Sequence, residues 1–249
     1  MAGDAPAAAP PPRAVKGADF RVLATDYDGT IASRGVVDEQ TLAALDRLRA
    51  SGRKLVLVTG RELSDLRSVF DHMDRFDVIV AENGAVLFKP GTCREVVITE
   101  PASPELVKLL VARGVQPLSV GHAIIATREP YERTVLDVIK ALGLEMQVTF
   151  NKGAVMVLPS GVNKATGLMA ALRELQLDPE STVAIGDAEN DHALLDLCGC
   201  SVAVGNALPA VKQRADFVTR GTHGAGVAEL IDLWLQDGLE ESVLKKHAA

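Results

Sequence analysis

The sequence predicts an α/β fold, in which a doubly wound, Rossmann-like parallel sheet is interrupted by a small inserted α+β domain. Near both ends of the chain, short apolar runs alternate with amphipathic helical segments, as they do in βαβ units. The middle of the chain instead contains a helix–strand–strand pattern twice, which is typical of an antiparallel sheet with helices on one face. A chain of 249 residues is long enough to bury a core in each domain.

The first part of the large domain begins near residue 20. Its first strand is a near-continuous apolar run, as expected of a strand covered on both faces. Its first helix carries Leu42, Leu45 and Leu48 on one side, and Gly52 ends it. The expected elements are strands over residues 20–25, 55–58 and 78–81 and helices over residues 38–50 and 62–70.

The inserted domain is expected over residues 85–160. Ser103 followed by Pro104 marks the start of its first helix, because serine is a good N-cap and proline suits the first helical position. Gly84 and Gly161 lie near the two crossings, where glycine would permit the rotation of a hinge. The expected elements are helices over residues 103–114 and 130–142 and strands over residues 117–120, 123–127, 146–150 and 154–158.

The large domain resumes at residue 161. Asn163 is expected to cap a helix whose apolar side includes Leu168 and Leu172. Strands over residues 182–185 and 202–204 and a helix over residues 226–235 complete it. The large domain therefore comprises residues 18–84 and 161–240. Residues 1–17 are rich in Ala and Pro, a composition that buries too little apolar surface to fold, and they are expected to form a disordered arm.

Composition narrows the classes of partner. The formal charge of −7 and the lack of a basic stripe argue against a nucleic-acid binder. No apolar stretch has the length needed to cross a bilayer and no secretory signal is evident, so no membrane partner is expected and the cytoplasm is the expected compartment. The three cysteines do not suggest a disulfide framework. A monomer or a homodimer is expected.

Four polar clusters follow or adjoin the strands expected in the large domain. In doubly wound sheets the binding crevice lies outside the carboxyl ends of the strands, so the four clusters are expected to converge there. Each cluster alone is also consistent with an ordinary exposed turn or helix start, whereas all four in this order are not. The clusters are Asp26-Tyr27-Asp28-Gly29-Thr30, Thr59-Gly60-Arg61, Lys164, and Gly186-Asp187-Ala188-Glu189-Asn190-Asp191.

The chemistry of these residues is complementary around a phosphate ester. Asp26 can attack phosphorus, and a Mg²⁺ ion held by Asp26, the Asp28 carbonyl and Asp187 would screen the repulsion between the two anions. Thr59, the neighbouring amides and Lys164 would bind the phosphate oxygens. The Asp28 side chain could protonate the leaving alkoxide and then activate water.

These four clusters resemble the signature of the haloacid-dehalogenase-like hydrolases. The resemblance covers essentially the whole chain after residue 17. The insertion is similar to a short class IIB (C2B) cap, and Glu82-Asn83-Gly84-Ala85 is similar to the Cof-like branch. The short cap resembles those of archaeal-type phosphoglycolate phosphatases and related sugar-phosphate phosphatases more than it resembles the larger sugar-phosphate caps. Tyr27 is bulkier than the residue usual between the two aspartates and is expected to pack against the sheet.

The resemblance implies a role for each matching residue. It makes Asp26 the nucleophile that forms an aspartyl-phosphate and Asp28 the general acid and base. The phosphate-binding residues it implies are Thr59, Gly60, Arg61, Lys164 and Asn190. The implied Mg²⁺ ligands are Asp26, Asp28, Asp187 and Asp191, the last directly or through water.

The sequence thus favours a Mg²⁺-dependent phosphatase that acts on a small phosphorylated metabolite, such as a sugar phosphate, a sugar-acid phosphate or phosphoglycolate. One alternative is a phosphotransferase or phosphomutase that passes the phosphoryl group from the same aspartate to another alcohol. A second alternative is a non-enzymatic phosphate-sensing module. The presence of both Asp28 and Lys164 disfavours the sensing module, which has less need of an acid for a leaving group.

Overall fold

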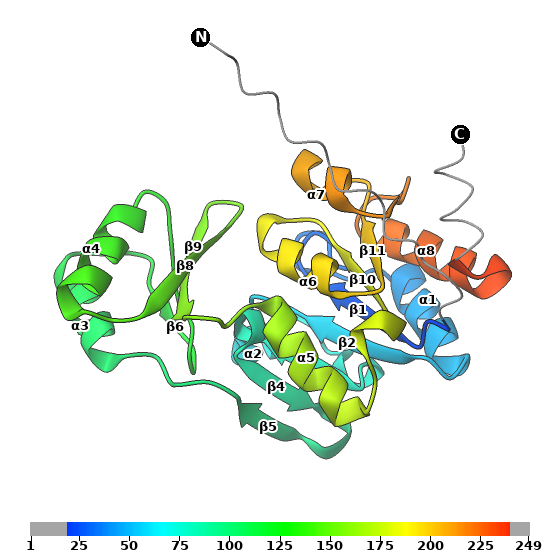
Figure 1. Cartoon of the computed structure of the whole chain (residues 1–249), viewed down its shortest axis with the longest axis horizontal. Coiled ribbons are helices and arrows are strands. Elements are labelled where there is room, and N and C mark those ends of the chain that lie inside the picture. The colour runs from blue at the N-terminus through cyan, green and yellow to red at the C-terminus, as the bar shows by residue number, and fades with distance from the viewer. Residues whose placement is uncertain (1–18, 240–249) are drawn as a thin grey trace, which may run out of the picture.

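The predicted fold class is confirmed by a computed structural model, which describes residues 19–239 (Figure 1). The expected arm over residues 1–17 lies outside the described residues. The large domain is built on an eight-stranded sheet in the order β12-β11-β10-β1-β2-β3-β4-β5, parallel from β12 to β3. Its strands are β1 (Val22–Asp26), β2 (Lys54–Val58), β3 (Val78–Ala81), β4 (Val86–Lys89), β5 (Arg94–Val97), β10 (Thr182–Gly186), β11 (Cys200–Ala203) and β12 (Phe217–Val218).

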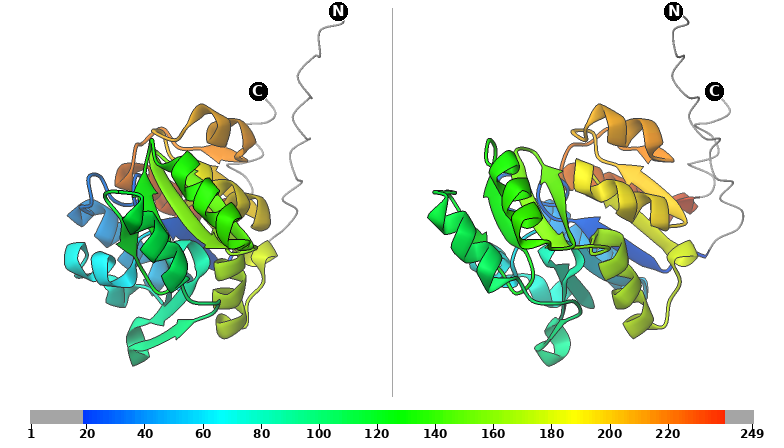
Figure 2. Two further views of the ribbon diagram at one scale, coloured as in Figure 1. Left: turned by 90° about the vertical axis from the view of Figure 1, so that its left-hand side faces the viewer. Right: turned by 60° about the vertical axis from the view of Figure 1, so that its left-hand side comes forward.

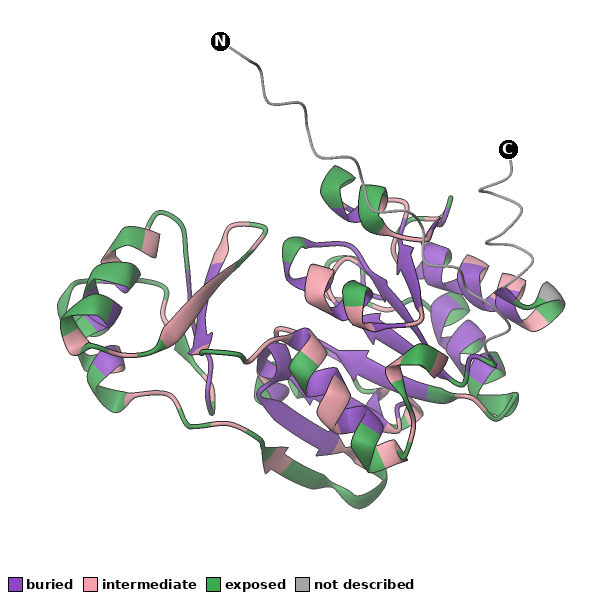
Figure 3. Cartoon of the chain, viewed as in Figure 1, coloured by how far each residue is buried: buried purple, intermediate pink, exposed green. Residues whose placement is uncertain are grey.

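Helices cover both faces of this sheet, as the doubly wound pattern requires. The central strands β1 and β10 are buried along their whole length (Figure 3), which matches their near-continuous apolar sequence. Helices α1 and α8 pack together on one face, and α5 and α6 pack together on the other. The helices are α1 (Glu39–Ala50), α2 (Leu63–Val69), α5 (Lys164–Leu175), α6 (His192–Leu197), α7 (Pro209–Arg214) and α8 (Gly224–Asp237).

The small domain is a four-stranded antiparallel sheet in the order β6-β7-β9-β8. Its helices cover the sheet face turned away from the large domain (Figure 2) and enclose a separate apolar cluster that includes Leu106, Val135 and Val157. Its elements are α3 (Pro104–Ala112), β6 (Ser119–Val120), β7 (Ile125–Arg128), α4 (Glu132–Leu142), β8 (Met146–Asn151) and β9 (Ala154–Pro159). None of the helices within residues 19–239 is both long and apolar enough to span a membrane.

The domain boundary expected at residue 85 is wrong. Strands β4 and β5 pair antiparallel with β3 and extend the large sheet, so the chain leaves that sheet only after Val97. Gly84, expected at a hinge, has a φ of +115° and packs so closely against the carbonyl of Asn163 that a Cβ there would collide with it. The two crossings therefore lie in residues 98–103 and 160–163, and a hinge at Gly161 stays a prediction.

Glu82 links the small domain to the large one through hydrogen bonds. Its side chain is fully buried, and its carboxylate accepts hydrogen bonds from the backbone N–H groups of His122, Ala123 and Ile124 at 2.9, 2.9 and 3.1 Å. A Cβ on Gly121 would lie only 2.7 Å from this carboxylate, so glycine is required for the approach. The Glu82 N–H in turn donates to the carbonyl of Arg61, which links the loop after β2 to the small domain.

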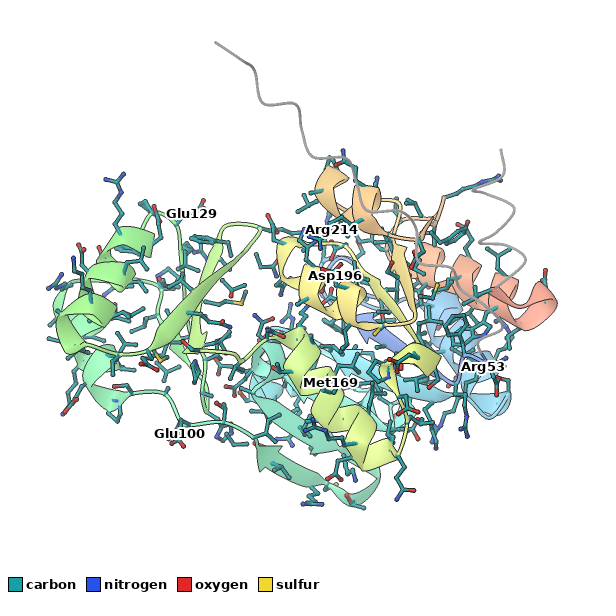
Figure 4. The ribbon with its side chains drawn as sticks, in the orientation of Figure 1. Arg53, Glu100, Glu129, Met169, Asp196 and Arg214 are labelled. Atoms are coloured by element: carbon teal, nitrogen blue, oxygen red, sulfur yellow. The ribbon has the colours of Figure 1, made fainter. Side chains whose placement is uncertain are left out.

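Replacing Glu82 with Gln should loosen this attachment. The amide has one acceptor oxygen where the carboxylate has two, so at least one buried N–H donor of the small domain loses its partner at a cost of about 1–3 kcal/mol. Hydrogen exchange should become faster at residues 122–124 than in the wild-type protein. The matched control is Glu100→Gln in the exposed linker (Figure 4), which should leave that exchange unchanged. Equal protection in the two variants would contradict the role assigned to Glu82.

Candidate active site

Lys164 is a buried cation at the carboxyl ends of the central strands. It begins α5, is 1% exposed, and donates hydrogen bonds to Asp26 at 2.5 Å and Asp191 at 2.6 Å. Asn163 caps the helix by accepting the N–H of Thr166 at 3.0 Å, which fixes where the first helical turn begins. A helix N-terminus disfavours a cation, so the two carboxylates hold the ammonium group in place against the helix dipole.

Three carboxylates surround this lysine from two strand ends. Asp26 ends β1, and Asp187 and Asp191 belong to the loop after β10, which includes the short 3-10 helix η5 (Glu189–Asp191). The backbone N–H groups of Asp187 and Ala188 donate to Asp191 at 2.9 and 3.0 Å, and the Thr30 hydroxyl donates to Asp187 at 3.2 Å. Asp191 is therefore held by hydrogen bonds within its own loop, and Asp187 by a hydrogen bond from the loop after β1.

Burial of these acids makes their ionisation costly. Desolvation raises the pKa of Asp26 to about 8; Lys164 opposes this shift, and the carboxylates of Asp191 and Asp187 add to it. Desolvation likewise raises the pKa of Asp187. A buried group of acids is tolerable when it shares protons or binds a cation.

The three acids fit a divalent cation. One oxygen from each of Asp26, Asp187 and Asp191 lies within 4.8 Å of the other two, and all three residues are buried. Carboxylate oxygens are the ligands that Mg²⁺ takes in proteins, usually with several waters retained. The side chain of Asp28 is outside this group, and its carbonyl as a ligand stays a prediction.

Asp28 is paired with Arg61 at the exposed side of the site. Both of its carboxylate oxygens accept hydrogen bonds from the guanidinium, at 2.5 and 2.8 Å, and its side chain is 39% exposed. Arg61 also donates to Asp65 at 2.6 Å. The hydrogen bond to Asp28 raises the pKa of Arg61 above its ordinary value. Arg61 therefore orients Asp28, and three of its N–H groups are already engaged by carboxylates.

Thr59, Gly60 and Asn190 lie on the remaining side. Thr59 follows β2 and is 1% exposed, and its hydroxyl accepts the N–H of Arg61 at 3.1 Å. Asn190 donates to the amide oxygen of Asn83 at 3.1 Å, and a Cβ on Gly60 would lie 3.7 Å from the Asn190 amide nitrogen. Within residues 19–239, the Asn190 amide oxygen is buried without a hydrogen-bond partner. Such a group marks a place where a bound donor would be stabilised.

Two residues at the site were not assigned from the sequence: Asn206 was missed, and for Lys152 a place on the inner face of the small domain and an ordinary surface position both stayed open. Lys152, at the turn between β8 and β9, forms an ion pair with Asp187 across the two domains. Asn206 donates to the carbonyl of Gly29 at 2.8 Å and accepts the N–H of His223 at 2.6 Å, which fixes the loop after β1. No motif marks Asn206. The pattern of two strands joined through Asn151-Lys152-Gly153 predicts a hairpin but not what its tip contacts.

Gly29 should not tolerate a side chain. Its φ is +90°, and an added Cβ would collide with Asp187 and lie 2.6 Å from the Lys152 amine. Gly29→Ala should therefore lower the free energy of unfolding by more than the ~1–2 kcal/mol of a strained backbone, and should displace Asp187. Gly52→Ala is a matched control, because Gly52 has a φ of +89° and nothing within 4 Å. Equal losses of stability in denaturant titrations of the two variants would contradict this packing.

Comparisons with known proteins agree with the fold. The sequence profile of the haloacid dehalogenase-like hydrolases matches residues 23–129 and 123–231. A phosphoglycolate phosphatase of Methanothermobacter thermautotrophicus is 31% identical over 218 residues, which are 85% of this chain and 97% of the relative. Phosphoglycolate phosphatase 2 of Saccharolobus solfataricus is 29% identical over 232 residues, which are 91% of this chain and 97% of the relative.

A solved structure with similar architecture is a haloacid dehalogenase-like hydrolase from Bacteroides thetaiotaomicron. It superposes with a TM-score of 0.71 at 22% identity and covers 86% of this chain and 98% of its own. Together these matches define the class of protein as a phosphatase. The assignment of the small domain as a class IIB cap stays a prediction. The chain belongs to the haloacid dehalogenase-like hydrolase family.

Proposed function

We propose that this chain hydrolyses phosphate monoesters of small metabolites with Mg²⁺, through an aspartyl-phosphate on Asp26. The observation that supports this proposal most directly is the buried cluster in which Lys164 contacts both Asp26 and Asp191, beside Asp187. Phosphoglycolate is the first candidate substrate, because two relatives similar over most of their length are phosphoglycolate phosphatases. A phosphorylated sugar or sugar acid is the next candidate.

The proposed reaction has two displacements. An oxygen of Asp26 attacks phosphorus, the bond from phosphorus to the ester oxygen breaks, and Asp28 gives a proton to the leaving alkoxide. Water then attacks phosphorus while Asp28 takes its proton, and the bond between phosphorus and Asp26 breaks. Lys164 and Thr59 bind the other phosphate oxygens, and Arg61 keeps Asp28 aimed at the leaving group.

Asp26, Asp187 and Asp191 would hold the Mg²⁺ ion. When bound, it supplies positive charge that offsets the repulsion between the phosphate and the carboxylates. Within residues 19–239, Lys164 and Lys152 contribute two positive charges against these three acids, which leaves one carboxylate without a cation.

Mg²⁺ should stabilise the folded protein more at pH 8 than at pH 6. Because the folded-state pKa of Asp26 is raised to about 8, the metal-free protein keeps a proton that the unfolded chain loses above about pH 4. The contribution of Asp26 to stability therefore falls as pH rises between these values. Mg²⁺ competes with that proton, so its binding tightens over the same window. Thermal melts with and without Mg²⁺ measure this, and a shift independent of pH would contradict it.

A phosphate-release assay over a panel of phosphorylated metabolites tests the proposed function. Phosphoglycolate, sugar phosphates and sugar-acid phosphates are compared by kcat/KM with Mg²⁺ and with excess chelator. Release of free phosphate without an added alcohol acceptor is expected, which separates a phosphatase from a phosphotransferase. Absence of release from every ester would contradict the proposal. The cytoplasm as compartment, the monomer or homodimer, and the lack of a nucleic-acid partner stay predictions.

A further inference from the structure

One face of the small sheet is turned toward the large domain. Directly opposed residues of paired strands share a face, so Ser119, Ala126, Met156 and Thr149 form one row across the sheet. Ala126 and Met156 pack against the core of the large domain, which fixes the orientation of this row. Arg128, Ala154 and Asn151 form the next row on the same face. This second row lies beside the catalytic loop, because β8 contacts η5.

A cavity of about 580 Å³ opens at this end of the small sheet. Its lining includes the cations Arg128 and Lys152, the carboxylate Glu129 (labelled in Figure 4), and the small residues Ala126 and Ala154. The alanines leave space where larger side chains would fill the sheet face. Within residues 19–239, Arg128 forms no ion pair, so its guanidinium has no carboxylate partner among these residues.

Lys152 connects the cavity to the catalytic carboxylates. It stands at a two-residue hairpin turn with Gly153, where both φ angles are positive (+47° and +85°), and this tight turn projects the lysine from the sheet. Its amine contacts Asp187 while its side chain remains 46% exposed. The other cations of the site, Lys164 and Arg61, are each engaged by two carboxylates.

Building on the proposed function, we infer that Lys152 and Arg128 form a subsite for the carboxylate of the leaving group. The substrate class is then the phosphate monoester of a short 2-hydroxy acid. Such a substrate brings one more negative charge into a site already rich in carboxylates, and that charge needs a cation beside it. A metal cation on Asp187 would replace Lys152 as the partner of that acid, which leaves the ammonium group for the substrate carboxylate.

Binding to the inactive Asp26→Asn background tests this subsite without requiring turnover. The two probes are phosphoglycolate and 2-hydroxyethyl phosphate, which carries a CH₂OH group in place of the carboxylate. In calorimetric titrations with Mg²⁺, adding Lys152→Met should weaken phosphoglycolate binding by about 10- to 100-fold, the range for a hydrogen bond to a charged group. Binding of 2-hydroxyethyl phosphate should change by less than about threefold, since it lacks the carboxylate. Arg128→Gln should show the same selectivity with a smaller loss.

Lys108→Met is the matched control, because Lys108 is an exposed lysine of the same domain on α3. It should leave binding of both probes unchanged. Equal weakening of the two probes by Lys152→Met, or no weakening of either, would overturn the subsite. Failure of the proposed function would be seen in a different measurement, because the wild-type enzyme would then release phosphate from neither ester. The effect of Lys152→Met on binding of phosphoglycolate relative to 2-hydroxyethyl phosphate would still decide the role of Lys152.

Discussion

Replacing Asp26 with Asn should reduce Mg²⁺-dependent phosphate release by about 10⁴-fold or more, because an amide cannot act as the attacking nucleophile. The substitution preserves the shape of the side chain, and its amide oxygen can still accept a hydrogen bond from Lys164. It also removes the buried acid whose pKa is raised to about 8, so the fold should be retained. Activity with the best ester of the panel, circular dichroism and thermal melts measure the two effects separately.

Asp71→Asn provides the control for Asp26→Asn. Asp71 is exposed and lies outside the site, so this variant should retain full activity. An Asp26→Asn variant that keeps more than about a tenth of wild-type turnover would exclude Asp26 as the nucleophile.

Replacing Lys164 with Met should damage both activity and stability. Desolvation alone would lower the pKa of Lys164, but the carboxylates of Asp191 and Asp26 outweigh it and raise that pKa, so the side chain is a cation. Removing it leaves two buried acids without their partner, which typically costs 3–5 kcal/mol, and we expect about that loss here. Activity should fall by about 10³-fold, because a preorganised phosphate-binding cation is lost. Denaturant titration and kcat/KM measure the two losses.

A double-mutant cycle identifies the source of the instability. If the loss comes from acids that lack a cation, adding Asp26→Asn to Lys164→Met should restore part of the free energy of unfolding, and saturating Mg²⁺ should restore more. Simple additivity of the two substitutions would indicate that Lys164 stabilises the fold through its packing, and would contradict the electrostatic explanation.

The alternation of apolar strands and amphipathic helices was enough to predict the α/β class and most elements. The expected helix over residues 38–50 and the strand over residues 78–81 agree with α1 and β3. The boundary at residue 85 could not be placed correctly. β5 (Arg94–Val97) is a largely exposed edge strand without alternating burial, and only its pairing with β4 assigns it to the large sheet. The short helix α7 and strand β12 carried too little periodicity to be recognised.

In the candidate site too, residues with a local sequence pattern could be predicted, whereas residues defined by contacts between distant segments could not. Asp26 and Asp187 stand at strand ends, where parallel topology alone predicts convergence, and Asp191 follows in the loop after β10. Lys152 could not be assigned, because a lysine at a hairpin tip is usually solvated and its contact with Asp187 depends on how two domains pack. Glu82 belongs to a motif recognised in the sequence, but its contacts could not be predicted, because its partners are backbone N–H groups about 40 positions away.

Trapping the phosphorylated enzyme tests the central claim most directly. The enzyme is quenched in acid during turnover of phosphoglycolate, or of the best ester of the panel, and treated with borohydride, which reduces an aspartyl-phosphate to homoserine. Tandem mass spectrometry of the peptide containing Asp26 should then find homoserine at position 26 and unchanged aspartate at position 28. Phosphate release with homoserine at another position, or at none, would contradict a phosphoryl group carried by Asp26.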